Sequence, residues 1–340
     1  VAITAGNGHT CALLDDGSVK CWGNGYDGQL GSGSTDDLGD GLNEMGDNLK
    51  AIDLGTGRTA VAITAGDSHT CALLDDGSVK CWGAGWHGRL GSGDTDRLGD
   101  GPGEMGGNLA AVALGAGRTA IAITAGSAHT CALLDGGDVK CWGGGIYGQL
   151  GSGSTDSLGD GPNEMGDNLK AVDLGKDRTA VAITAGGFHT CAVLDGGDVK
   201  CWGWGIYGQL GSGSTDSLGD GPDEMGDNLK AVDLGTGRTA VAITGGNGHT
   251  CAVLDDASLK CWGYSYDGQI GSGSINTLGD ESNEMGDNLA AVELGGSSPL
   301  RVQEVTAVLM QRFAEASTTA QHAATAADAA TSASTETARL

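Results

Sequence analysis

The run VAITAGNGHTCALLDDGSVKCWG occupies residues 1–23 and decides how this chain folds. Nearly the same run begins again at Val61, Ile121, Val181 and Val241. A fixed period of this size predicts stacked supersecondary units rather than one irregular core. It also allows an internal comparison, in which constant positions serve the fold and variable positions are candidates for function.

Each copy reads as four short β-strands with turns between them. In the first copy, β-type runs cover residues 1–5, 9–14, 19–22 and 51–54, and glycine-rich and acidic loops separate them. This pattern is typical of a propeller blade. We therefore predict an all-β protein, a β-propeller of five four-stranded repeats at 1–60, 61–120, 121–180, 181–240 and 241–295.

Composition excludes several classes of protein. Glycine accounts for 65 of 340 residues, but there is no Gly-X-Y period and only 4 prolines, so the chain is not collagen. A formal net charge of −26 argues against nucleic acid or an anionic membrane as the main partner, since both require a basic patch. No apolar run is long enough for a membrane-spanning helix. The acidity indicates a solvated surface or, alternatively, cationic partners or metal ions.

The turn at residues 15–17 sets the register of the central hairpin. Asp-Asp-Gly suits a type I turn followed by glycine in the left-handed region. That register places Leu13 opposite Val19 and Cys11 opposite Cys21, within reach of a disulfide.

The same pairing is available in every copy, and we predict five disulfides. The pairs are Cys11/Cys21, Cys71/Cys81, Cys131/Cys141, Cys191/Cys201 and Cys251/Cys261. Five disulfides imply an oxidising compartment. Ten reduced core thiols are one alternative, and a zinc site using His9 with the two cysteines of a repeat is another, although the spacing is not CxxC. The repeated histidine is more simply structural, tying down the turn before it.

Residues 8–33, GHTCALLDDGSVKCWGNGYDGQLGSG, resemble the repeat of the regulator of chromosome condensation family. Its pattern is Gly-x-x-His-(Ser/Thr), a hydrophobic strand, an acidic glycine turn, Trp-Gly and Gly-Gln-Leu-Gly. The copies depart from it at Arg89, Ile270 and Ala257. The resemblance implies a propeller of four-stranded blades, usually seven. The founding member exchanges nucleotide on a small GTPase and binds chromatin, whereas relatives are ubiquitin-ligase modules, inhibitors or surface proteins. The EMGDNL segment resembles a long-repeat microbial or secreted variety.

Variable positions gather in two loops that should lie at one end of each blade. These loops follow the first and the third strand, around residues 7–8 and 24–27. They are rich in aromatic residues, which are favoured in protein interfaces. The predicted partner-binding residues are Tyr26, Trp86, His87, Tyr147, Phe188, Trp204, Tyr207, Tyr264 and Tyr266. Drift at loosely packed positions would explain the same variation. The constant tryptophans, Trp22 and its equivalents, are interpreted as blade core.

An acidic loop at residues 35–48 is nearly constant between copies. Its carboxylates would allow calcium binding, but the spacing is not that of an EF-hand, and Gly107 replaces Asp47 in the second copy. Local turn and cap bonds, with ion pairs to the repeated arginine (Arg58, Arg118, Arg178 and Arg238), are the simpler interpretation. No catalytic constellation stands out, and we expect neither an enzyme nor a cofactor.

The ends of the repeat array leave closure open. Residues 51–54 should pair with the next copy, so a closed ring would pair residues 291–294 with residues 1–5. Because the chain begins in mid-strand, we expect truncation and an incomplete or loosely closed ring. Residues 296–340 are predicted to form an amphipathic helix at 301–315 and an Ala/Thr/Ser-rich tail.

The sequence as a whole favours a non-enzymatic protein-recognition scaffold that uses the variable aromatic loops. Alternatives are a guanine-nucleotide exchange factor for a small GTPase, or a calcium-dependent surface or adhesion protein. The expected partner is another protein and not nucleic acid, and the expected location is extracellular, cell-surface or another oxidising compartment.

Overall fold

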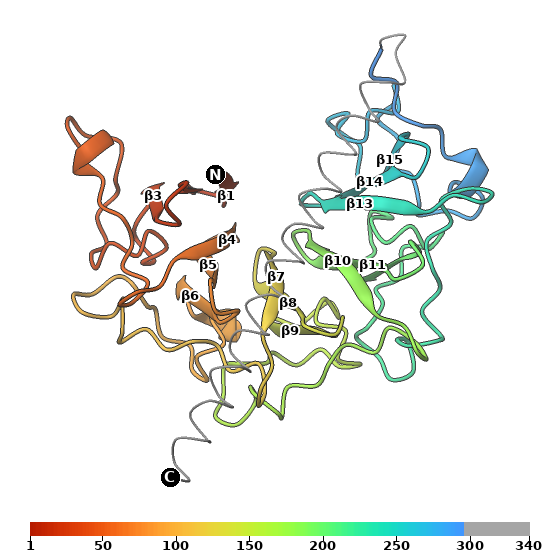
Figure 1. Ribbon diagram of the computed structural model, residues 1–340. Helices are drawn as coiled ribbons and strands as arrows, with labels where there is room; N and C mark the ends of the chain where they lie inside the picture. Colours follow the sequence, from red (N-terminus) through yellow and green to blue (C-terminus); the bar gives the residue numbers. More distant parts are fainter. Residues whose placement is uncertain (296–340) are drawn as a thin grey trace, which may run out of the picture. The chain divides into compact units, whose positions relative to one another are not determined.

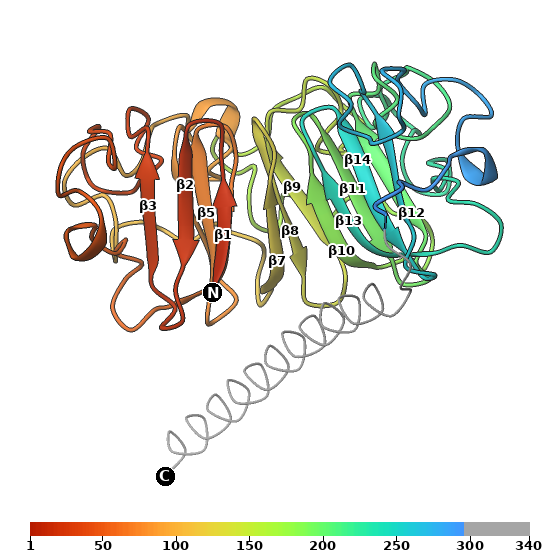
Figure 2. The same cartoon turned by 90° about the horizontal axis from the view of Figure 1, so that it is seen from above.

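The structure, a computed structural model, describes residues 1–295. Residues Val1–Glu293 form one compact unit of five three-stranded antiparallel sheets. The sheets follow one another in chain order, and their strands run side by side (Figures 1 and 2). The all-β propeller-type fold is thus confirmed, while the helix predicted at 301–315 lies outside the described residues.

The strands recur at nearly constant places in each repeat. Their bounds are β1 (Ala2–Ala5), β2 (His9–Leu13), β3 (Val19–Gly23), β4 (Ala60–Ala65), β5 (His69–Leu74), β6 (Val79–Gly83), β7 (Ala120–Ala125), β8 (His129–Leu134), β9 (Val139–Gly143), β10 (Ala180–Ala185), β11 (His189–Leu194), β12 (Val199–Gly203), β13 (Ala240–Gly245), β14 (His249–Leu254) and β15 (Leu259–Gly263). Three short 3₁₀ turns complete the elements: η1 (Gly46–Asn48), η2 (Trp86–Gly88) and η3 (Gly286–Asn288).

The central hairpin has the predicted register. Leu13 pairs with Val19, and Cys11 pairs with Cys21. The Leu14 amide donates to the Ser18 carbonyl oxygen at 2.9 Å, and Gly17 has φ 78°, as a bulged hairpin requires. Turn geometry therefore decides which residues face each other across the hairpin.

The predicted fourth strand was wrong in two respects. Residues 51–54 form no regular strand, although the Ile52 amide donates to the Val19 carbonyl oxygen at 2.8 Å. The segment therefore flanks β3 of its own repeat and does not pair with β4, although the Gly106 amide of the next copy donates to the Asp53 carbonyl oxygen at 3.0 Å. The reason lies at the start of β4. The Ala60 amide donates to the Gly17 carbonyl oxygen at 2.8 Å, so the chain has already crossed to the hairpin turn of its own repeat where β4 begins.

The core is built between neighbouring repeats. One cluster combines Cys71 and Leu73 of the second repeat with Leu134 and Trp142 of the third. Trp82, Trp142, Trp202 and Trp262 are completely buried in this way. Trp22 is only partly buried, contrary to its predicted core role, because no repeat of the described chain precedes it. A repeat thus depends on its neighbours for its core.

Ring closure is not seen in residues 1–295. There β1 pairs only with β2, and residues 291–294 form no strand. The sheets β1-β2-β3 and β13-β14-β15 lie at the two ends of the series of five sheets in Figure 1. Ile3 of β1 is exposed, whereas the equivalent Ile63 is half-buried against its neighbours.

Candidate functional site

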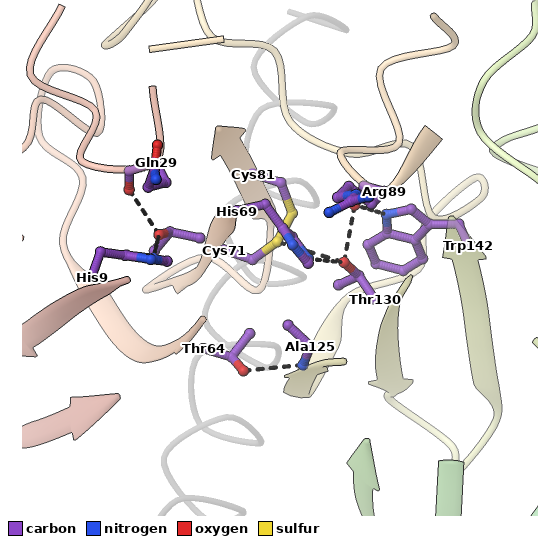
Figure 3. Close-up of a disulfide and its surroundings, with 11 residues drawn as sticks. His9, Gln29, Thr64, His69, Cys71, Cys81, Arg89, Ala125, Thr130 and Trp142 are labelled. Carbon is purple, nitrogen blue, oxygen red and sulfur yellow. Dashed lines mark hydrogen bonds between the residues drawn. A yellow bond between two sulfur atoms is a disulfide. The ribbon is translucent and has the colours of Figure 1, made fainter. Parts of the chain in front are cut away.

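A network of hydrogen bonds between a histidine, a threonine, a tryptophan and a backbone carbonyl, which we call the lock, joins each repeat to the next (Figure 3). His69 Nε2 lies 2.9 Å from Thr130 Oγ1, and the Thr130 hydroxyl donates to the Arg89 carbonyl oxygen at 2.9 Å. Trp142 Nε1 donates to the same carbonyl oxygen at 3.1 Å. Because Thr130 has only one proton to donate, its oxygen accepts from His69 Nε2, which fixes the histidine tautomer. The lock also forms at His9, His129 and His189.

Burial keeps these histidines neutral. It lowers the pKa of His9 to about 4 and those of His129 and His189 to about 3. The pKa of His69 is also well below its ordinary value, through burial first and the charge of Arg89 second. The predicted structural role holds, with the added finding that the ring bonds to the next repeat as well as packing on the turn before it.

The cysteines of each repeat face each other across the central hairpin, as the turn chemistry predicted. Every pair is at disulfide-bonding distance, with sulfur–sulfur separations of 2.08–2.12 Å and Cα–Cα separations of 4.1 Å. The pairs are Cys11 with Cys21, Cys71 with Cys81, Cys131 with Cys141, Cys191 with Cys201, and Cys251 with Cys261. No free cysteine occurs in the described repeats, so the alternative of ten reduced thiols finds no support in this geometry.

These sulfur pairs lie directly behind the lock. Cys71 Sγ lies 4.0 Å from Thr130 Oγ1, so the sulfurs and the histidines share one buried layer. The cysteines on the third strand of each sheet are all buried, namely Cys21, Cys81, Cys141, Cys201 and Cys261. Within residues 1–295, no three histidine, cysteine or carboxylate side chains are placed to hold a metal ion, which gives the zinc alternative no support.

The variable loops meet at one end of each blade, as the strand order implied. The Trp204 amide donates to the Phe188 carbonyl oxygen at 2.8 Å, and the Tyr264 amide donates to Gly248 at 2.8 Å. The same bond joins the two loops in every repeat. We call this end of the blades the variable face.

Six aromatic residues of the third to fifth repeats form a continuous series on this face. Tyr147 stacks on Trp204 at 5.1 Å, Trp204 meets Tyr207 edge to face at 5.1 Å, and Tyr207 contacts Tyr264 at 4.8 Å. Three of the six ring contacts cross a boundary between repeats, and the other three lie within one repeat. The aromatic row consists of Tyr147, Phe188, Trp204, Tyr207, Tyr264 and Tyr266.

The first two repeats arrange their aromatic residues differently. Arg97 lies over Tyr26 at 4.9 Å and over Trp86 at 5.7 Å, and its guanidinium pairs with Asp27 at 3.2 Å. Arg89 lies 5.6 Å from the Trp86 ring. Tyr26 and Trp86 therefore lie outside the aromatic row, and each contacts an arginine on part of its ring. The predicted His87 is exposed beside them, with φ 60°.

Two residues of this face were missed in the sequence. Ile146 and Ile206 occupy the position of Tyr26 in their repeats, where every copy has a large apolar side chain. All five are exposed: Tyr26 61%, Trp86 44%, Ile146 65%, Ile206 48% and Tyr266 67%. Comparing this position between the five repeats would have identified both isoleucines, but a prediction that considered mainly aromatic residues omitted them.

The acidic loop is held by local bonds. Glu44 Oε2 accepts from the amides of Gly39 and Gly41 at 2.7 and 2.8 Å, and these bonds lower the carboxyl pKa. The expected ion pairs to this loop were wrong. Arg58 pairs with Asp75 and Asp76 of the next hairpin turn at 3.2 and 2.7 Å, because β4 begins beside that turn.

Comparison with known proteins identifies the repeats. The family described as "Regulator of chromosome condensation (RCC1) repeat" matches residues 1–29, 60–88, 120–149, 180–209 and 240–269. The chain is 34% identical to the ultraviolet-B receptor UVR8 of Arabidopsis thaliana over 275 residues, which cover 80% of this chain and 55% of the receptor. It is 29% identical to the human E3 ubiquitin-protein ligase HERC2 over 82% of this chain but only 5% of the ligase.

The structural comparison supports the same fold. Human WBSCR16 superposes with a TM-score of 0.63 at 20% identity, over 87% of this chain and 67% of that one. No helix within residues 1–295 is long and apolar enough to cross a membrane. The chain therefore contains five RCC1 repeats, and it spans about half of UVR8 and a small part of HERC2.

Proposed function

We propose that this chain, with its five RCC1 repeats, is a non-enzymatic scaffold that binds a partner protein through the variable face. The observation that carries the proposal is the position of Tyr26, Trp86, Ile146, Ile206 and Tyr266. Its residue type differs between repeats, yet it is large, apolar and exposed each time. Single exposed apolar residues are common on protein surfaces, whereas a series of them on one face indicates an interaction site.

The aromatic row supplies the kind of surface that protein interfaces use. Tyrosine and tryptophan give large contact areas with few rotatable bonds, so little entropy is lost when they are covered. Here the rings also hold one another in place, since Trp204 contacts Tyr147, Phe188 and Tyr207. A partner would meet a rigid surface.

The proposed location is extracellular, cell-surface or another oxidising compartment. Support comes from the five cysteine pairs at bonding distance, because disulfides persist where the surroundings are oxidising. The exchange-factor and calcium-dependent alternatives, and the absence of a cofactor, remain predictions, and no contact on the variable face favours either alternative.

Site-directed photo-cross-linking tests this proposal. A photoreactive phenylalanine analogue is placed at Ile206 or at Tyr266 of the full chain, expressed in its native source. The matched control is Gly196, which is exposed in a hairpin turn at the opposite end of the blade. We expect one common protein adduct from both face positions and none from Gly196. No adduct from the face, or the same adduct from Gly196, would contradict the proposal.

A further inference from the structure

We propose that the aromatic row binds an extended, arginine-bearing segment of the partner protein. This inference rests on the proposed function and adds the chemistry of the partner. It comes from comparing the repeats with one another on the same face.

In the second repeat the chain supplies its own arginine to the exposed rings. Arg97 lies over Tyr26 and Trp86, and Asp27 pairs with its charge at 3.2 Å. A guanidinium between an aromatic face and a carboxylate is favourable because its planar cation stacks on the ring while its N–H groups bind the acid. The variable face thus already forms this arrangement once.

The third to fifth repeats have the rings without the arginine. Ser157, Ser217 and Thr277 stand where Arg97 stands in the second repeat, and Gln149, Gln209 and Gln269 stand in place of Arg89. The arginines of this part of the chain lie at the other end of the blades. Arg178 and Arg238 pair with the carboxylates of hairpin turns, at 2.9 to 3.3 Å. The site for a cation is therefore open to an arginine from outside.

A carboxylate borders the row at Asp267, as Asp27 borders Arg97. Asp267 is exposed beside Tyr266. Burial is the first cause that raises the pKa of the Tyr264 hydroxyl, and the charge of Asp267 is the second. With a net charge of −26, the chain attracts a basic segment and repels an acidic one.

The course of the row indicates an extended occupant. The rings run in series from Tyr147 in the third repeat to Tyr266 in the fifth, each within 6.4 Å of the next. Ile146 and Ile206 are exposed in the same repeats and would contact apolar residues between the arginines. A segment lying along the row therefore meets several repeats in succession.

The test is a titration of the full chain, with cysteines oxidised, by a short peptide in which arginine alternates with glycine. Two further peptides replace arginine by lysine or by citrulline, which has nearly the same shape without the charge. We expect the arginine peptide to bind roughly tenfold more tightly than the citrulline peptide, and more tightly than the lysine peptide, as cation–π energies of about 1–2 kcal/mol imply.

Variants separate the row from general attraction to an acidic protein. Tyr266→Ala removes the exposed ring at the end of the row and should weaken binding of the arginine peptide several-fold without changing any charge. Val181→Ala removes an exposed apolar side chain of β10, outside the variable face, and should leave it unchanged. Three results would overturn the inference. They are equal binding of the arginine and citrulline peptides, equal effects of the two variants, and a preference of the protein for a neutral oligosaccharide over the arginine peptide. If those results came with a protein adduct at Ile206, the proposed function would stand and the arginine chemistry alone would fail.

Discussion

Replacing His129 with glutamine should make the protein less sensitive to acid by about 2 kcal/mol. His129 is completely buried between repeats, and its Nε2 lies 2.9 Å from Thr190 Oγ1. Burial lowers its pKa from 6.5 to about 3, with smaller contributions from the charges of His189 and Arg89. A glutamine amide can donate the same hydrogen bond to Thr190 but does not titrate.

The direction follows from the two pKa values. The pKa is lower in the folded state, so the stability that neutral His129 provides is fully present above pH 6.5 and is lost as the pH falls towards 3. Each pH unit in this window costs about 1.4 kcal/mol, so the loss between pH 7.5 and pH 5 is about 2 kcal/mol. Glutamine at position 129 removes only the acid dependence that His129 contributes, and the histidines of the other locks keep their contributions.

Urea unfolding under non-reducing conditions, at pH 7.5 and pH 5, measures the effect. The loss of unfolding free energy on acidification should be smaller by about 2 kcal/mol in His129→Gln than in the wild type. The control is Val181→Ser, because Val181 is an exposed side chain that does not titrate, so its replacement should leave the acid dependence unchanged. Equal acid dependence of the wild type and His129→Gln would refute the reasoning.

Three further predictions concern the scaffold. Gly144→Asn should stabilise the fold by roughly 1–2 kcal/mol in urea unfolding. In the first repeat Asn24, at the equivalent position, accepts from Gln29 Nε2 at 2.7 Å, whereas Gln149 Nε2 in the third repeat is buried without a partner. No gain in stability would count against this prediction. Gly83→Ala should destabilise by about 2 kcal/mol or more, since Gly83 has φ 110° and a Cβ there would meet the Ser68 carbonyl oxygen at 2.5 Å; a wild-type melting temperature would contradict this. A thiol reagent added to unfolded, unreduced protein from its native source should label no cysteine, whereas stoichiometric labelling would exclude both the disulfides and the oxidising location.

Local turn chemistry made the hairpin predictable. A three-residue turn ending at Gly17 leaves one favourable register, and that register alone puts Cys11 opposite Cys21. The clustering of variable loops was equally accessible, because antiparallel strand order places alternate loops at the same end.

Features that depend on contacts between distant parts of the chain could not be predicted from local sequence in the same way. The place of residues 51–54 depends on the Ile52 bond to Val19 and on the crossing at Ala60, both of which join distant parts of the chain. The contact of Arg97 with the Trp86 ring likewise depends on three-dimensional proximity. Most rings of the aromatic row are half-buried against one another, so removing a stacked ring such as Trp204 would disturb the face itself, whereas Tyr266 is exposed.

The most direct test of the variable face is the affinity of the cross-linked partner for the triple variant Ile146→Ser, Ile206→Ser and Tyr266→Ser. These side chains are exposed, so the melting temperature should stay close to that of the wild type. The control is Val181→Ser, which removes an apolar side chain that is 58% exposed on β10. The account predicts that the triple variant binds at least tenfold more weakly while the control binds normally; wild-type affinity of the triple variant would contradict it.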